Sequence, residues 1–341
     1  MTNKKYRPLL YSLLIILILV IFFIFYQQRT QNTTKKPEPI SGTAFKLNTV
    51  INIKIYDSAD QSLIDEVFHL CDKYEALFSR TLESSELYKL NHGTLPKQDE
   101  NYIVSAETAD LIAKGLTYSR LSEGSFDISI EPVSSLWDFT SEKKAVPTQA
   151  ELTHALSLVD YKDVTLTGNH IQFQKEGMSL DLGAIAKGYI ADRMKDFLVS
   201  KGVSSAIINL GGNVLCIGEK PDGTPFQVGI QRPFADRSET IASIGISDKS
   251  VVSSGIYERF FEKDGQFYHH ILNPATGYPY DNSLISVTII SEKSVDGDGL
   301  STSCFALGLE KGMALINGIP DVHAVFITDD YKLHYSENFP K

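Results

Sequence analysis

Residues 43–56, "TAFKLNTVINIKIY", alternate between apolar and polar side chains, with the apolar positions at Phe45, Leu47, Ile51, Ile53 and Ile55. This period of two predicts a pair of β-strands. From Asp60 to Leu77 the apolar residues recur three and four positions apart instead. That spacing predicts an amphipathic α-helix.

The same two periods continue along the chain. A second helix is predicted after a Ser105 cap and ends near Gly124, and a third spans Ala184–Val199. Strands are predicted at 205–210, 226–231, 239–247 and 284–291, and strand pairs at 255–272 and 323–336, which turn at 263–265 and 329–330. Because helices interleave with mostly antiparallel strands, we expect an α+β fold with mixed, mostly antiparallel sheets and packed helices.

The N-terminus departs from both patterns. Residues 9–26 form an uncharged run of 18 residues, long enough to just span a bilayer, and Lys4, Lys5 and Arg7 precede it. No small-x-small cleavage site follows. We predict a basic cytoplasmic segment at 1–8, one transmembrane helix at 9–26, a polar, proline-containing linker at 27–42 and a body at 43–341. The chain is then a single-pass protein of the cell membrane with its body outside the cytoplasm.

Charge and cysteine content argue against two classes of protein, those that bind nucleic acids and those held together by disulfides or zinc. After the first 40 residues the chain carries 26 basic and 41 acidic side chains. An acidic body argues against nucleic-acid binding, which depends on phosphate neutralisation. The three cysteines Cys71, Cys216 and Cys304 lie far apart and form no CxxC. A disulfide framework and a zinc site are therefore not expected.

The stretch "SVDGDGLSTS" (294–303) has three possible meanings. A calcium loop starting at Asp296 fails, because Leu300 and Leu307 occupy positions that require oxygen ligands. Two alternatives stay open. Asp298 caps a helix that starts beside it, with Ser301 and Thr302 in the first turn, or the stretch binds Mg²⁺ against a phosphate ligand.

Four other stretches combine unusual residues, and each also has a purely structural interpretation. "EGSFDISIEPVSSLWDF" (123–139) reads as a strand with a buried aromatic pair, Phe126 and Trp137. "SLDLGAIAKGYIADRM" (179–194) places Asp181 and Lys187 at a helix start, which can attract phosphate or be capped by the aspartate. "INLGGNVLCIG" (208–218) has two adjacent glycines after a strand, which allow a close backbone approach or simply a tight turn. "YHHILNPATGYPY" (268–280) has two adjacent histidines, which on a strand point to opposite faces, followed by a Pro-x-Thr-Gly turn.

Taken together, these stretches resemble one family. "GSFDISIEPVSSLW", "LDLGAIAKGYIADR", "NLGGN", "SSGIYERFF", "HHILNPATGYP", "DGDGLSTSCFALG" and "FSRTLESSELYKLN" occur in the order and spacing of the ApbE family, the FAD:protein FMN transferases. The resemblance covers about residues 42–336. It implies an ApbE-like fold and an enzyme that transfers FMN from FAD, through a phosphoester bond, to a Ser or Thr of a target protein and releases AMP.

The resemblance also implies a site. Mg²⁺ would be held by the Ala184 carbonyl, the Asp298 carboxylate and the Thr302 hydroxyl, and His270 would be the catalytic base. FAD, as substrate, would contact Ser125, Phe126, Asp127, Asp181, Lys187 and Leu272. The implied partners are FMN-accepting proteins of electron-transfer systems outside the cytoplasm.

Three positions depart from the common family pattern, namely Ser41, Asn273 and Ser301. An FAD-binding or FAD-hydrolysing protein with no protein acceptor is the alternative function. Hydrolysis and transfer share one site and differ only in the acceptor, which is water or a protein hydroxyl. The sequence therefore leaves the balance between them open.

Overall fold

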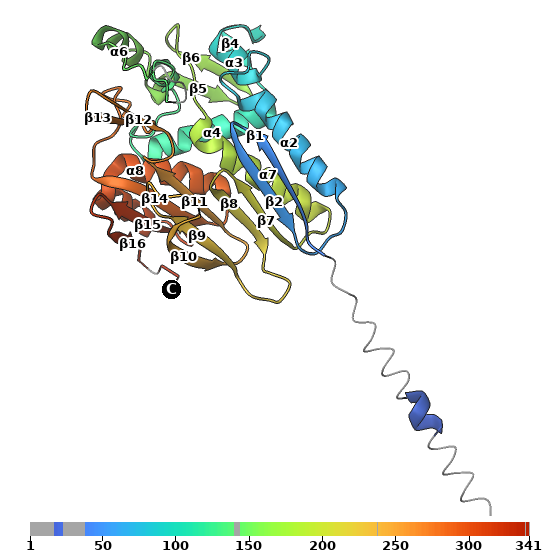
Figure 1. Cartoon of the computed structure of the whole chain (residues 1–341). Coiled ribbons are helices and arrows are strands. Elements are labelled where there is room, and N and C mark those ends of the chain that lie inside the picture. Colours follow the sequence, from blue (N-terminus) through green and yellow to red (C-terminus); the bar gives the residue numbers. More distant parts are fainter. Residues whose placement is uncertain (1–16, 23–37, 140–143, 237, 338, 341) are drawn as a thin grey trace, which may run out of the picture. The chain divides into compact units, whose positions relative to one another are not determined.

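The computed structural model describes residues 17–22, 38–139, 144–236, 238–337 and 339–340. It divides into two units, Met1–Glu38 and Pro39–Lys341, and each is considered by itself. In the first unit, residues 17–22 are helical and exposed. The second unit holds all the strands and the remaining helices that are described below (Figure 1).

An eight-stranded sheet forms the centre of the second unit. Its strands, in spatial order, are β1 (Ile40–Lys46), β2 (Thr49–Ile55), β7 (Ser205–Leu210), β8 (Asn213–Gly218), β11 (Ser250–Gly255), β14 (Leu284–Ser291), β15 (His323–Thr328) and β16 (Leu333–Tyr335). Neighbouring strands pair antiparallel throughout. The central strand β14 is buried at all eight positions, because both faces of the sheet are covered.

Helices cover one face of this sheet and a β-hairpin covers the other. The helices are α2 (Ser62–Phe78), α4 (Ala106–Leu121), α7 (Gly183–Ser200) and α8 (Ser294–Asn317), and the hairpin is β9 (Phe226–Gln231) with β10 (Thr240–Ile246). Strand β15 shows the division, since Ala324 and Phe326 join the core under the helices while Val325 and Ile327 join the core under the hairpin. The alternation of apolar side chains along one strand thus builds two cores.

Smaller elements complete the body at the end that carries α3 and α6 in Figure 1. They are α3 (Glu86–Asn91), β3 (Lys97–Gln98), β4 (Asn101–Ile103), α5 (Glu131–Ser134), α6 (Gln149–Leu156), the 3₁₀ turn η1 (Tyr161–Asp163), β5 (Val164–Thr167), β6 (His170–Phe173), β12 (Phe260–Lys263) and β13 (Gln266–His269). Strands β3 to β6 form a separate sheet in the order β3-β4-β6-β5. A third apolar cluster forms around Trp137, Leu152 and Phe261.

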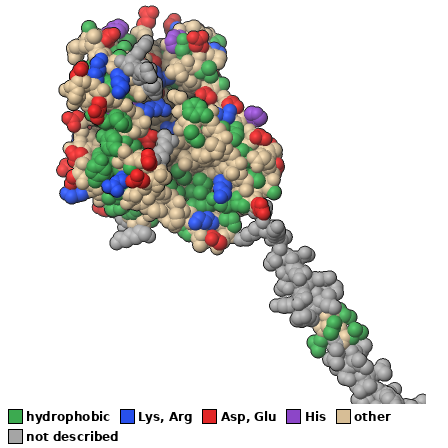
Figure 2. Space-filling model, in the orientation of Figure 1, with side chains coloured by type: hydrophobic (Ala, Val, Ile, Leu, Met, Phe, Trp, Pro, Cys, Tyr) green, Lys and Arg blue, Asp and Glu red, His purple; other side chains and the backbone are tan. Residues whose placement is uncertain are grey.

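The α+β class with antiparallel sheets is as the sequence predicted. The first strand begins at Ile40, so residues 40–42, expected in the linker, belong to the sheet. The stretch 123–139 is not a strand, because it contains the short helix α5 flanked by turns. On the face drawn in Figure 2, acidic and basic side chains are interspersed with small hydrophobic groups.

The predicted transmembrane helix at 9–26 lies outside the described residues apart from 17–22. Within the described part of the chain, no helix combines the length and the apolar character that crossing a membrane requires.

Candidate functional site

The candidate site lies where α7 crosses α8. Asp298, on α8, is buried, and its Oδ2 accepts the backbone N–H of Gly188 on α7 at 2.5 Å. The other oxygen, Oδ1, accepts the side-chain amide of Asn213 at 3.1 Å. A Cβ on Gly188 would lie 2.3 Å from the Ser294 carbonyl oxygen, so the two helices approach too closely there for any other residue.

The Ala184 carbonyl belongs to the same place. In an α-helix the N–H of residue i points at the carbonyl of residue i−4. The N–H of Gly188 therefore points along α7 toward Ala184, and the Asp298 carboxylate reaches that same N–H from α8. A backbone carbonyl and a carboxylate are thus neighbours at the helix crossing.

Thr302 follows Asp298 by four residues on α8 and so lies on the same helix face. Its hydroxyl lies 3.0 Å from the Ser254 hydroxyl of β11. The Ser301 hydroxyl also lies close to the Ser254 hydroxyl, at 2.8 Å, and it donates to the Asp298 backbone carbonyl at 3.0 Å. Thr302 thus lies one turn from Asp298 on α8, and the Ala184 carbonyl lies one turn before the Gly188 N–H that Asp298 accepts, while Ser301 shares the Ser254 contact with Thr302.

This donor set fits Mg²⁺. Carboxylate, hydroxyl and carbonyl oxygens are hard ligands, and Mg²⁺ takes few of them because it retains waters and substrate phosphates. Among the described residues, no three His, Cys, Asp or Glu side chains form a metal-binding group. An all-carboxylate or thiolate cage is therefore not the kind of site found here.

The prediction that Asp298 caps a helix is wrong. Helix α8 begins at Ser294, so Asp298 is already inside it. The cap comes from α7, where Asp192 Oδ1 accepts the N–H of Ser294 at 2.8 Å and Oδ2 accepts that of Val295 at 3.0 Å. Burial raises the Asp192 pKa to about 6.

The glycines beside Asp298 permit close packing of the helix. A Cβ on Gly297 would lie 2.6 Å from a methyl carbon of Val252, and one on Gly299 would lie 2.4 Å from the Tyr118 ring. The "DGDG" sequence is therefore a helix segment pressed between β11 and α4. The sequence resembles a turn because this close packing requires glycine at positions 297 and 299.

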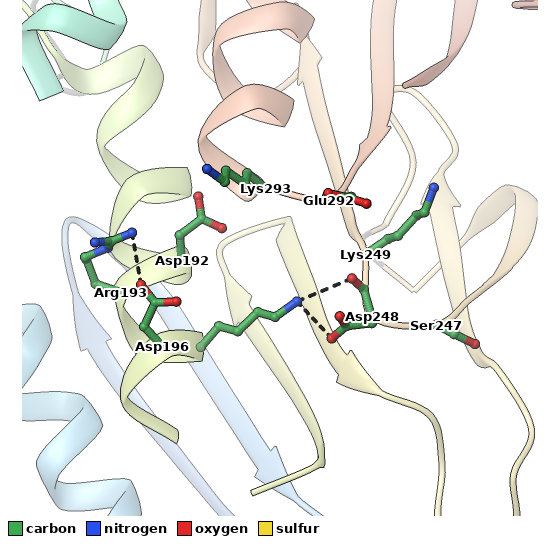
Figure 3. A pocket seen from close by; sticks show the side chains of 9 residues that line it. Asp192, Arg193, Asp196, Ser247, Asp248, Lys249, Glu292 and Lys293 are labelled. Carbon is green, nitrogen blue, oxygen red and sulfur yellow. Dashed lines mark hydrogen bonds and ion pairs between the residues drawn. The ribbon is translucent and has the colours of Figure 1, made fainter. Parts of the chain in front are cut away.

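Asp192 also borders a hollow of about 380 Å³ between α7 and the segments that lead into β11 and α8 (Figure 3). Four acidic and four basic side chains line it together with Ser247: Asp192, Asp196, Asp248, Glu292, Arg193, Lys195, Lys249 and Lys293. None of the predicted site residues is among them. The hollow is a separate feature from the site at the helix crossing.

The start of α7 carries the two residues that the sequence singled out. Asp181 Oδ1 accepts the N–H of Gly183, the first residue of α7, at 2.9 Å, and Arg80 Nε lies 3.3 Å from its other oxygen. The N-cap residue itself is Leu182, so Asp181 stands one position before the cap. Lys187 follows on α7 and is partly buried. Burial raises the pKa of Asp298, and the Lys187 charge opposes this rise.

The two adjacent histidines have different environments, as their opposite faces predicted. His269 is buried, and its Nδ1 accepts the N–H of Ile271 at 3.3 Å, so its Nε2–H donates to the Tyr280 carbonyl at 2.9 Å. His270 is only partly buried, and its Nδ1 lies 3.3 Å from the Arg259 carbonyl. A carbonyl can only accept, so Nδ1 carries the proton and Nε2 presents the lone pair.

His270 is neutral in this environment. Burial lowers its pKa to about 3, and the positive charges of Arg259 and Lys187 act in the same direction. The positive charge of Lys187 therefore acts on both groups, since it lowers the pKa of His270 and opposes the rise of the Asp298 pKa.

The predicted FAD-contact residues at 125–127 mostly serve their own loop. Phe126 is 6% exposed and meets the Tyr118 ring edge-on at 6.3 Å. Asp127 is buried, and its two oxygens accept from Ser129 and from the N–H of Tyr161. Phe126 and Asp127 thus fix the shape of the loop at 125–127. The backbone carbonyl of Ser125 is turned toward the histidine segment, which is residues 268–280.

Tyr280 joins that loop to the histidine segment. Its hydroxyl donates to the Ser125 carbonyl at 2.8 Å and its N–H to the Ile271 carbonyl at 3.0 Å. Leu272 is buried next to this link and bridges to Pro279. No local pattern predicted the role of Tyr280, because the contact joins residues 155 positions apart.

A helix start with a nearby lysine, and a buried carboxylate close to hydroxyl and carbonyl oxygens, have the chemistry that a phosphate ligand and a divalent cation require, and they stand in an α+β body. The family model described as "ApbE family" matches residues 47–326. The chain belongs to the ApbE family, as its motifs predicted.

Individual relatives agree with this assignment. An FAD:protein FMN transferase of Klebsiella pneumoniae (strain 342) is 41% identical over 84% of this chain and 89% of its own length. One of Treponema pallidum (strain Nichols) is 33% identical over 85% and 84%. The solved flavin transferase ApbE of Vibrio cholerae superposes with a TM-score of 0.79 at 28% identity and covers 89% of this chain and 98% of its own.

Proposed function

We propose that this protein is an FAD:protein FMN transferase, which moves the FMN half of FAD onto a Ser or Thr hydroxyl of a target protein and releases AMP. The observation that carries the proposal is the α7–α8 crossing, where the buried Asp298 carboxylate accepts the N–H of Gly188, the residue after Lys187. The positive charge of Lys187 also lowers the pKa of His270. Relatives that are 41% and 33% identical bear the name of this activity.

The reaction needs one bond made and one broken. The acceptor hydroxyl oxygen bonds to the phosphorus of the FMN half, the bond from that phosphorus to the bridging oxygen breaks, and AMP leaves with that oxygen. His270 accepts the hydroxyl proton at Nε2. Because bound diphosphate adds negative charge beside the imidazole, it favours the protonated form and raises the His270 pKa toward the range of a useful base.

Lys187 and the N–H groups at the start of α7 neutralise phosphate oxygens and hold them in place. The Ala184 carbonyl, Asp298 and Thr302 would hold Mg²⁺. Bound there, Mg²⁺ supplies positive charge for the diphosphate oxygens. Ser125, Asp181 and Leu272 would contact FAD at the loops that border the helix start, with Phe126 and Asp127 setting the loop shape.

Residues 1–8 would form a cytoplasmic segment, 9–26 a membrane anchor and 27–39 a linker that ends before β1, and the body would work outside the cytoplasm. The support is the basic flank, the uncharged run and the missing cleavage site. The acceptors would then be proteins of electron-transfer systems on that side of the membrane.

The test is to incubate the full chain in detergent with FAD, Mg²⁺ and candidate acceptor proteins, and to measure acceptor mass and AMP. An FMN-sized mass addition on a Ser or Thr, with equimolar AMP, is expected. AMP and free FMN without any modified acceptor would instead support FAD hydrolysis. If no AMP is released from FAD, with or without an acceptor protein, both the transferase and the hydrolase activity are contradicted.

A further inference from the structure

Asn213 is the first residue of β8 and follows the glycine pair of the β7–β8 turn. Its side chain is only 2% exposed, because the α7–α8 crossing covers this part of the sheet. Its Nδ2 donates to Asp298 Oδ1 at 3.1 Å, and its Oδ1 accepts the Ser294 hydroxyl at 2.6 Å. One buried amide therefore contacts both the start of α8 and the carboxylate inside it.

The contacts fix which way this amide points. An ionised carboxylate only accepts hydrogen bonds, so the NH₂ group must face Asp298. The amide oxygen then faces Ser294, whose hydroxyl donates to it. The two ends of the amide cannot be exchanged without leaving a buried polar atom unpaired, which is destabilising.

The carboxylate is held on both sides as a result. Gly188 N–H binds Oδ2 and Asn213 binds Oδ1, so rotation of the Asp298 side chain would break one bond or the other. Each oxygen retains a second lone pair for another partner. This is how groups around a metal site orient its ligands.

We propose that Asn213 is a positioning residue that holds the Asp298 carboxylate in the orientation in which it binds a divalent cation. The inference rests on the proposed function for the identity of the site, but not on the transfer step. A core amide that only ties β8 to α8 would stabilise the fold without influencing cation affinity. The two roles therefore differ in what they predict.

The experiment measures Mn²⁺ affinity by electron paramagnetic resonance on the full chain in detergent with FAD bound. Asn213→Ala should weaken binding by about 10–100-fold, the usual effect of removing a group that orients a metal ligand. Saturating Mg²⁺ should restore most of the transfer rate, whereas a fold defect would not respond to cation. Equal Mn²⁺ affinity in Asn213→Ala and the unmodified chain would overturn the proposal.

Asn209→Ala is the matched control. Asn209 belongs to the same turn, and its Oδ1 accepts the N–H of Gly212 at 2.9 Å. Its removal perturbs the turn and should leave Mn²⁺ affinity within about twofold, well below the loss expected at Asn213. A loss as large as that of Asn213→Ala would mean that the turn, and not the amide, sets the affinity, and would overturn the proposal.

If Asn213→Ala does not fold, Asn213→Asp decides. This variant keeps the size and the acceptor for Ser294 but sets an oxygen against Asp298 Oδ1 in place of the donor. Weaker Mn²⁺ binding is expected, and equal or tighter binding would assign the position to a direct ligand and overturn the positioning role.

An unmodified chain that binds Mn²⁺ but transfers no FMN would contradict the proposed function alone. An unmodified chain that binds no Mn²⁺ would overturn the inference about Asn213. If that chain still transferred FMN without added cation, the proposed transferase function would stand.

Discussion

The Asp192 carboxylate of α7 accepts the N–H of Ser294, the first residue of α8, at 2.8 Å. The helix that carries Asp298 is therefore capped by the helix it crosses. This contact links the stability of the crossing to pH, because burial raises the Asp192 pKa from its ordinary value of 3.8 to about 6.

A carboxyl group whose pKa is higher in the folded state binds its proton more tightly there. Its contribution to stability is therefore greatest at low pH and declines between about pH 4 and about pH 6. At about 1.4 kcal/mol per pKa unit, the decline is on the order of 3 kcal/mol. Asp192→Asn should remove this part of the slope in chemical denaturation measured across that pH range.

Asp196→Asn is the matched control for that series, since it makes the same change one turn further along α7, at a side chain that is 64% exposed. It should keep the slope of the unmodified chain. A slope that persists in Asp192→Asn would show that other groups cause it.

Asp298→Ala should abolish cation-dependent turnover of FAD while the chain stays folded. Asp298 is the one carboxylate among the three proposed ligands, and even groups that only orient a ligand cost about 10–100-fold when removed. The loss should therefore exceed about 100-fold. Turnover of FAD with released AMP is the measurement, circular dichroism reports folding, and unchanged turnover in excess Mg²⁺ would rule out the role.

His270→Ala should slow FMN transfer by about 10²–10⁴-fold, the usual effect of losing a general base. FAD affinity should change far less, because the proposed proton transfer takes place after FAD is bound. Single-turnover transfer to an acceptor, measured beside FAD affinity, separates the two quantities.

His269→Ala is the control at the neighbouring position, because His269 is the last residue of β13 and His270 follows it directly. It removes a buried ring with two hydrogen bonds, so it should lower stability by about 1–3 kcal/mol and spare the transfer rate of the folded fraction. Slow transfer in His269→Ala with normal transfer in His270→Ala would reverse the assignment of the base.

The full chain should sediment with membranes, and a chain lacking residues 1–38 should not. The reason is the 18-residue uncharged run behind a basic flank, which also predicts that the body lies outside the cytoplasm. Protease added to intact cells freed of their outer layers should digest the body. A protected body, or a mature N-terminus after Tyr26, would contradict the anchor.

Local patterns predicted the elements well. The stretch "LISVTIIS" at 284–291 became β14 with the same bounds, and the alternation around Leu47 became the β1–β2 hairpin. Both rest on neighbouring side chains, which a sequence displays directly.

The failures came from contacts between distant residues. The start of α8 was misplaced because its cap, Asp192, lies 102 positions earlier in the chain. The roles of Asn213 and Tyr280 depend in the same way on partners 85 and 155 positions away. Motif resemblance singled out Ala184, Asp298 and Thr302 as metal-ligand candidates, which stay a prediction, but it said nothing of the contacts that hold Asp298.

The close contact at Gly188 has a consequence for binding. With α7 and α8 touching there, and Asp298 held from both sides, the carboxylate is oriented before any ligand arrives. The entropy of ordering that side chain is lost during folding and not during association. Affinity for a cation and its phosphate ligand then depends mainly on charge and desolvation. Structures with and without FAD should therefore superpose closely at this crossing.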